Sequence, residues 1–286
     1  MLLHDAAFDQ LRWALEPGVI APLGVSALLY GRGALELRRR GRGIALRRWE
    51  AACFAGGWVI VALALLSPLH DASEQLFSMH MVQHELLMAV AAPLLILGRP
   101  MMVMLWALPA RGRHAVARLS RRASVRATWR AITRPFDAWL IHGLAIWIWH
   151  LPALFESTLH NEAIHALQHA CFLGTGLLFW WSIIHGQRRA ALGMSIVYLF
   201  TTAVHTGVLG ALMTFSRVPW YPAYGDGAAA WGLTPMADQQ LAGLIMWIPA
   251  SLAYLVAALA IMRRWLVDSE WTVVWREKAA SDASQR

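Results

Sequence analysis

The sequence predicts an all-α membrane protein, a bundle of seven transmembrane helices that forms a single domain over residues 1–286. Three observations support this prediction: 58% of the residues are hydrophobic, only 15% are charged, and the mean hydropathy is +0.46. A soluble domain of this length usually contains about 25% charged residues. The shortage of charge therefore excludes a disordered chain, a nucleic-acid-binding domain and an ordinary cytosolic enzyme.

Seven segments are apolar enough to cross the hydrocarbon core, which takes about 20 helical residues. The expected spans are residues 18–31, 49–68, 76–98, 136–155, 162–185, 190–216 and 237–262. The first is the shortest and is interrupted by Pro22. No secretory signal peptide is expected, because the first residues include Asp5 and Asp9 instead of a basic segment followed by a short apolar run.

The distribution of basic residues predicts the orientation, since cytoplasmic loops carry an excess of lysine and arginine. With seven spans, all of the 25 basic residues except Arg12 and Arg217 fall on one side. The C-terminal tail, residues 263–286, is therefore expected in the cytoplasm and the N-terminus outside. The arginines are then orientation signals and contacts for anionic membrane lipid, and nucleic acid is not an expected partner. Residues 110–131 interleave basic and apolar side chains, which predicts a helix lying on the inner membrane surface.

The pattern H-x-x-Q-H occurs twice, at the start of the third span and at the start of the fifth. The two copies consist of His80, Gln83 and His84, and of His165, Gln168 and His169. Each follows a span and a short outer loop that contains a proline, Pro68 or Pro152. Spans two and three and spans four and five are therefore interpreted as a direct repeat of a two-helix hairpin.

The spacing within the motif favours metal binding. Residues four apart lie on one helix face with Cβ atoms about 5–6 Å apart, so two imidazoles can reach one metal ion. Ionisable groups inside membrane spans are rare and usually functional. We therefore expect His80, His84, His165 and His169 to be metal ligands. Because neutral imidazole is the form that binds metals, the affinity should fall as the pH drops through about 6.5.

Other residues are expected to support this site. Gln83 and Gln168 lie near the histidine face, where each could orient a ligand ring by a hydrogen bond. Further candidate ligands lie in the outer halves of the spans: His150, His205, Asp238, Met79 and Met81. Methionine favours Cu(I), while imidazole suits copper, zinc and iron. Methionine is also ordinary packing material in apolar helices, so the two methionines are weaker candidates than the histidines.

Three other functions can be compared with metal capture. A zinc hydrolase would normally carry H-E-x-x-H, but Met88 stands where the second histidine would follow His84 and Glu85. A membrane redox protein that clamps one haem between the two motif helices remains open. A metal transporter also remains open, although no pair of acidic residues deep in the membrane marks an ion path. We expect reversible metal binding without enzymatic turnover and assign no catalytic residue.

The run from His80 to Pro100 resembles the signature of CtaG-type cytochrome c oxidase assembly factors, which are seven-span bacterial membrane proteins. Residues 149–152, the second histidine motif and residues 238–249 are also similar to the family pattern. The resemblance covers residues 18–265 and does not extend to the termini or to the arginine-rich inner loop. It implies a multi-pass protein of the bacterial inner membrane that helps to mature a haem–copper oxidase by delivering or inserting copper. The implied partners are an oxidase subunit or other assembly factors.

Overall fold

The computed structural model describes residues 13, 16–40, 46–185 and 192–284, and this part of the chain is helical and contains no strand. The elements, in chain order, are α2 (Pro17–Arg40), α3 (Arg48–Leu66), α4 (Pro68–Gln75), α5 (Phe77–Glu85), the π-helix η1 (Leu86–Ala91), α6 (Ala92–Leu97), α7 (Pro100–Ala107), α8 (Ala110–Ser120), α9 (Ala123–Ile132), α10 (Pro135–Trp149), α11 (Pro152–His160), α12 (Glu162–Ile184), α13 (Leu192–Phe215), the 3-10 helix η3 (Pro222–Tyr224), α14 (Gly225–Ala230) and α15 (Pro235–Ser284).

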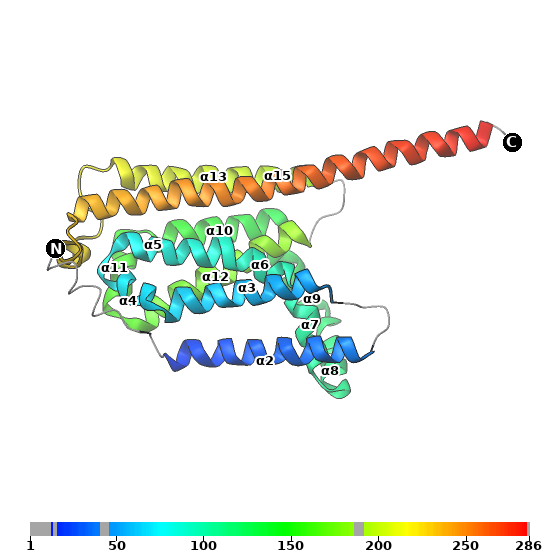
Figure 1. Cartoon of the computed structure of the whole chain (residues 1–286), viewed down its shortest axis with the longest axis horizontal. Coiled ribbons are helices and arrows are strands. Elements are labelled where there is room, and N and C mark those ends of the chain that lie inside the picture. The colour runs from blue at the N-terminus through cyan, green and yellow to red at the C-terminus, as the bar shows by residue number, and fades with distance from the viewer. Residues whose placement is uncertain (1–12, 14–15, 41–45, 186–191, 285–286) are drawn as a thin grey trace.

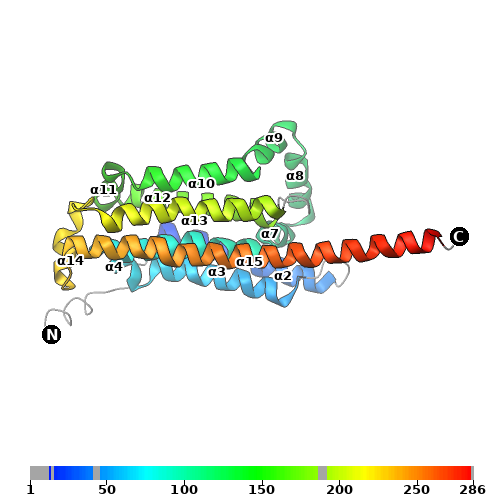
Figure 2. The same cartoon turned by 90° about the horizontal axis from the view of Figure 1, so that it is seen from above.

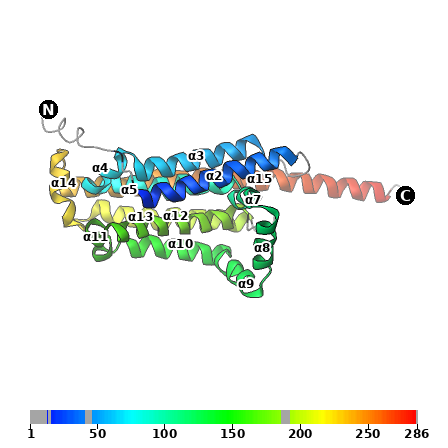
Figure 3. The same ribbon diagram turned by 90° about the horizontal axis from the view of Figure 1, so that it is seen from below.

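The long helices lie side by side in a bundle, as Figure 1 shows. The short helices α4, α11 and α14 lie at one end of the bundle, which we call the α4 end, and α7, α8 and α9 lie at the other, the α8 end (Figure 3). Among the described residues, six helices are long and apolar enough to cross a membrane. The bent pair of α10 and α11 makes a seventh if it is counted as one span.

The fourth expected span, residues 136–155, is divided between two helices. α10 ends at Trp149, and α11 begins at Pro152 after a bend of 72°. Leu151 is extended, as expected for a residue that precedes proline. The 15 residues of α10 reach only about 22 Å at 1.5 Å per residue, less than the usual hydrocarbon thickness of about 30 Å.

The expected hairpin repeat is visible in the order of the helices. α3, α4 and α5 are matched by α10, α11 and α12, and in both halves a proline begins the short middle helix. The Ser67 side chain caps α4, and the Asn161 side chain caps α12 by accepting hydrogen bonds from Ala163 and Ile164. These caps fix the positions at which α4 and the second motif helix, α12, begin.

The third span changes its helical geometry before Pro93. The chain is α-helical to Glu85 and then forms the π-helix η1, which gives way to α6 just before the proline. A proline lacks the amide hydrogen and crowds the carbonyl four residues earlier, so the wider turns of a π-helix relieve the clash. The indole nitrogen of Trp180 donates to the Met88 carbonyl oxygen in this segment (2.9 Å).

The first span is longer than expected, since α2 continues from Pro17 to Arg40 and tolerates Pro22. It packs mainly at its second half, where the Tyr30 ring stacks on Phe54 and the Tyr30 hydroxyl donates to the Gly98 carbonyl oxygen (2.8 Å). α7, which the sequence did not predict, lies against this half of α2. A Cβ at Gly33 would collide with the carbonyl oxygen of Val103, so only glycine permits this close approach.

The arginine-rich segment 110–131 is not the single helix that we expected. It forms α8 and α9, and the break comes where Arg122 adopts an extended conformation. Neither helix buries a residue, and Figure 2 shows α8 running across the direction of the bundle. The expected C-terminal tail is helical as well, because α15 continues to Ser284 and projects beyond the α8 end (Figure 1).

Candidate metal site

The four motif histidines come together between α5 and α12 near the α4 end. Within each motif, the ring centroids of His80 and His84, and those of His165 and His169, are 4.4 Å apart. Between the motifs, His80 and His165 are 5.0 Å apart, and His84 and His169 are 5.4 Å apart. All four side chains are buried. The two helices therefore present one cluster of imidazoles, as the repeat predicted.

Three of these histidines could bind one metal ion together. Nitrogen atoms of His80, His165 and His169 all lie within 4.8 Å of one another. Nitrogen ligands at the usual metal–nitrogen distance of about 2.0–2.1 Å would be roughly 3.4 Å apart in a tetrahedral site. Small rotations of the side chains would therefore bring the three nitrogens onto an ion, with His84 adjacent as a fourth ligand.

Several nitrogens of the cluster are buried without a hydrogen-bond partner in the described structure. They are both ring nitrogens of His84 and Nε2 of His165 and of His169. Buried polar atoms are nearly always satisfied, and an exception calls for an explanation such as an ion. A set of imidazole ligands suits copper or zinc. The residues present therefore fit a bound metal.

His80 is held by groups outside the two motifs. Its Nδ1 lies 2.9 Å from the Tyr224 hydroxyl, which donates to the carbonyl oxygen of Ser73 (3.2 Å). Burial raises the pKa of the Tyr224 hydroxyl well above its usual value, so this group stays protonated. The Oε1 atom of Gln168 lies 3.1 Å from Nε2 and can only accept, so Nε2 carries a hydrogen that must leave before this nitrogen binds a metal. The Tyr224 hydroxyl and the Gln168 amide oxygen therefore hold the two ring nitrogens of His80 in place.

The two motif glutamines have different partners. Oε1 of Gln168 accepts a hydrogen bond from Nε2 of His80, on the opposite helix (3.1 Å). Gln83 instead donates to the carbonyl oxygen of Ala64 (2.6 Å) and contacts Nδ1 of His70 (3.3 Å). The structure therefore does not bring Gln83 to the four motif histidines.

His70 is a site residue that the sequence analysis missed. It lies on α4, and its ring stacks at 5.6 Å from that of His165. Its Nε2 lies 3.2 Å from a Glu16 oxygen and 3.7 Å from a Glu74 oxygen. No motif marks His70. Its position two residues after Pro68, at the 85-residue offset that pairs it with Phe155, was the one available signal.

Two of the other candidate ligands lie at the edge of the cluster or support it. The His150 ring is 6.0 Å from that of His84, and its Nδ1 donates to the Ile146 carbonyl oxygen (2.6 Å). The Asp238 carboxylate accepts hydrogen bonds from the backbone amides of Phe77 and Ser78 (2.7 and 3.0 Å). Asp238 thus caps the first turn of α5 and positions the helix that carries His80.

The remaining candidates lie elsewhere. Met81 is buried in an apolar cluster with Phe77 and Ile146. Met79 is half-buried, and the structure describes no contact between its sulfur and the histidines. The His205 ring lies 6.2 Å from that of Trp139, on the face of α13 that contacts α10, and is not brought to the motif histidines.

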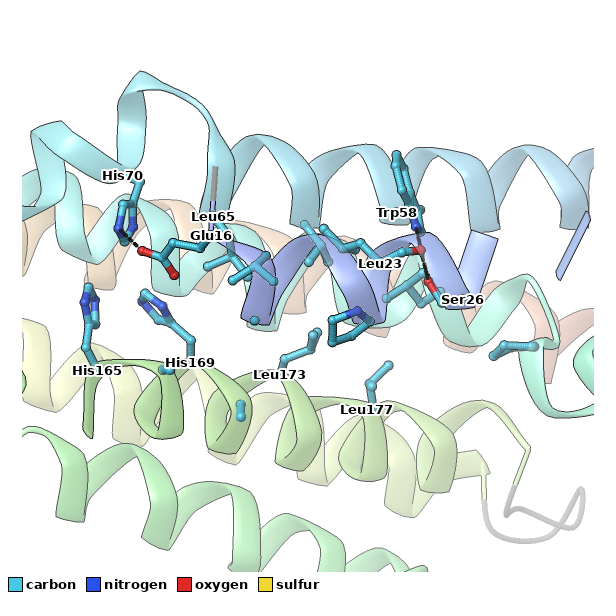
Figure 4. Close-up of a pocket in the computed structure, with 18 of the residues that line it drawn as sticks. Glu16, Leu23, Ser26, Trp58, Leu65, His70, His165, His169, Leu173 and Leu177 are labelled. Carbon is cyan, nitrogen blue, oxygen red and sulfur yellow. Dashed lines mark hydrogen bonds and ion pairs between the residues drawn. The ribbon is translucent and has the colours of Figure 1, made fainter. Parts of the chain in front are cut away.

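A groove with a volume of about 470 Å³ adjoins the cluster, between α2, α3 and α12. Figure 4 shows His165 and His169 on one wall, and His70 with Glu16 across from them. Leucines line the groove further along, including Leu23, and the carboxylate and imidazole side chains gather at the α4 end. The buried cluster is therefore reachable from one side.

The family model of the cytochrome c oxidase caa3 assembly factors (Caa3_CtaG) matches residues 28–268 of the chain. An uncharacterized protein of Mycobacterium tuberculosis is 28% identical over 264 residues, which cover 88% of this chain and 39% of that protein. An uncharacterized protein of Mycobacterium leprae is 26% identical over 283 residues, which cover 95% of this chain and 42% of that protein. The chain thus spans about two fifths of the length of these relatives. No solved structure matches it.

Proposed function

We propose that this chain, which belongs to the cytochrome c oxidase caa3 assembly factor family, binds copper reversibly at the cluster of His80, His84, His165 and His169. The bound copper would be delivered to a haem–copper oxidase during its assembly. The observation that carries this proposal is the convergence of four buried imidazoles from two repeated motifs, several of them without hydrogen-bond partners. The partner would be an oxidase subunit or another assembly factor.

The proposed topology has seven spans, with the bent pair of α10 and α11 counted as one, in the bacterial inner membrane. We place the α4 end outside and the C-terminus in the cytoplasm. The exposed arginines of α8 and α9 at the α8 end support this orientation, because basic residues concentrate on the cytoplasmic side. The histidines then lie near the outer membrane face.

The geometry supports capture and release rather than turnover. His80 is fixed by Tyr224 and Gln168, so this imidazole is already oriented. Nε2 of His165 and of His169 has no hydrogen bond to break before it binds an ion. Release would require only the reverse rotation of these rings, and the groove beside them gives a route out. No covalent step is needed, and the proposed role is not enzymatic.

The proposal is tested by measuring copper bound to the chain purified in detergent. The wild type should bind about one copper ion per chain after anaerobic loading with Cu(I), and the His80→Ala/His165→Ala variant should lose at least about tenfold in affinity because two ligands are gone. His114→Ala, at an exposed position on α8, is the matched control and should bind as the wild type does. A wild type that binds no copper would contradict the proposal, and a Soret band in the purified protein would favour the haem alternative.

A further inference from the structure

The groove beside the histidine cluster changes character along its length. Most of its wall is apolar, with Leu65, Leu173 and Leu177 among the side chains that Figure 4 shows. At the α4 end the lining is polar instead, and consists of Glu16, His70, Glu74, Glu162, His165 and His169. Among the described residues that line the groove, none is a lysine or an arginine. This end therefore has an uncompensated negative charge.

The carboxylates at this end repel one another. Partial burial raises the pKa of Glu74 above its usual value, and the nearby charges of Glu16 and Glu162 add to the shift, while His70 opposes it. The Glu74 and Glu16 side chains keep 59% and 47% of their surface exposed, so both remain open to water. A cation arriving from water would relieve this repulsion, since opposite charge favours ionised carboxylates.

His165 supplies the second observation, because it faces the same groove from a buried position. Its Nε2 has no hydrogen-bond partner in the described structure, and only 8% of the residue is exposed. It lies on α12 one turn after Glu162, and its ring is 5.6 Å from that of His70. A side chain with an unpaired imidazole nitrogen thus lines the same groove as the carboxylates.

His70 holds one of these carboxylates in place. The Gln83 amide uses one hydrogen on the Ala64 carbonyl oxygen, and its other hydrogen points to Nδ1 of His70. Nδ1 is then the acceptor, so the hydrogen of His70 is on Nε2 and is donated to Glu16 (3.2 Å). His70 is therefore a positioning residue that sets Glu16 at the mouth of the groove, and it is not a free ligand.

We propose that Glu16, Glu74 and Glu162, together with Nε2 of His165, form an outer capture site for a divalent cation such as Cu²⁺. Carboxylate oxygens with one imidazole suit such an ion better than Cu(I), which favours sulfur ligands. The inference rests on the proposed function, because the buried cluster is the destination of the captured ion.

His165 connects the capture site to the cluster. Its ring centroid is 4.4 Å from that of His169 and 5.0 Å from that of His80. An ion bound by the carboxylates and His165 would reach the other two histidines by exchanging its oxygen ligands for nitrogen while His165 stays bound. The carboxylates would therefore govern how fast the cluster fills, and the histidines how tightly it holds the ion.

The test is a stopped-flow measurement of Cu²⁺ binding to the full chain in detergent, followed by the quenching of tryptophan fluorescence. The Glu16→Gln/Glu74→Gln/Glu162→Gln variant should bind Cu²⁺ about tenfold more slowly at low salt, since charge-lined clefts raise association rates by about 10- to 1000-fold. The difference should shrink as salt rises, and the final amount of bound Cu²⁺ should equal that of the wild type. Glu156→Gln on α11, outside the groove, removes one charge as the single variant Glu162→Gln does, so it is the control for that variant and should load at the wild-type rate.

The outcomes separate this inference from the proposed function. A triple variant that loads at the wild-type rate and to the wild-type amount would overturn the capture site while leaving the cluster intact. A wild type that binds Cu(I) but no Cu²⁺ would overturn the capture site alone, and one that binds neither ion would overturn both proposals. The single variant Glu162→Gln changes an exposed side chain in the first turn of α12, so it should preserve folding. It should slow loading about twofold, and an unchanged rate would also count against the capture site.

Discussion

The two halves of the repeat differ most in the short helix that precedes each motif helix. α4 carries His70, and α11 carries Phe155 at the equivalent position. Phe155 is completely buried, and its ring lies 4.9 Å from that of His80. His70 instead contacts Glu16 beside the groove. One side of the cluster is therefore closed by an aromatic ring, and the other is open through polar groups.

The glutamines of the two motifs show the same asymmetry. Gln168 contacts His80 inside the cluster, whereas Gln83 contacts His70 next to the groove. In the proposed function, the repeated motif supplies the metal ligands, and the departures from the repeat supply the route by which an ion would reach them. Two kinds of variant test this difference between the halves.

The largest effect is expected on the stability of the Phe155→Ala variant, because this change removes the ring that closes one side of the histidine cluster. Truncating a fully buried phenylalanine typically costs about 3–5 kcal/mol in the free energy of unfolding. Phe155 packs against the rings of Phe77 and Tyr221 as well as His80, so little collapse into the cavity is expected. Thermal unfolding of the purified protein in detergent measures the loss. Leu167→Ala, at a 54% exposed position on α12, is the control, and equal melting temperatures for the two variants would contradict the structural role of Phe155.

A smaller effect, on the affinity for copper, is expected from replacing Gln168 and Gln83 one at a time. Gln168→Leu should raise the dissociation constant for copper about tenfold, because partners that orient metal-binding histidines typically contribute 10- to 100-fold. Gln83→Leu should change it less than about twofold, since Gln83 contacts His70 and not the cluster. Equilibrium titration of both variants measures the difference. Equal losses of copper affinity in the two variants would show that the two halves of the repeat are functionally alike.

Much of this arrangement could be predicted from the sequence because it depends on local patterns. Apolar length predicts the spans, and the four-residue spacing predicts that two histidines share a face of each motif helix. The break at Leu151 also had a local signal, Pro152. The family resemblance, drawn from the motifs, is confirmed by the family model.

The parts that could not be predicted depend on contacts between distant segments. Glu16 meets His70 only because α2 lies beside α4 and α12. Tyr224 reaches His80 from the segment between α13 and α15. Asp238 resembled a ligand in the sequence, but its oxygens cap α5 through the amides of Phe77 and Ser78, which no sequence spacing indicates.

The central claim is that imidazoles from both motifs bind one copper ion, and X-ray absorption spectroscopy of the copper-loaded chain tests it most directly. The expected spectrum contains three or four nitrogen ligands at about 2.0 Å with the outer-shell scattering typical of imidazole rings. The His80→Ala/His165→Ala variant should lose that pattern. A first shell dominated by sulfur, or an imidazole pattern that persists unchanged in the variant, would contradict a copper site built from the repeated motif.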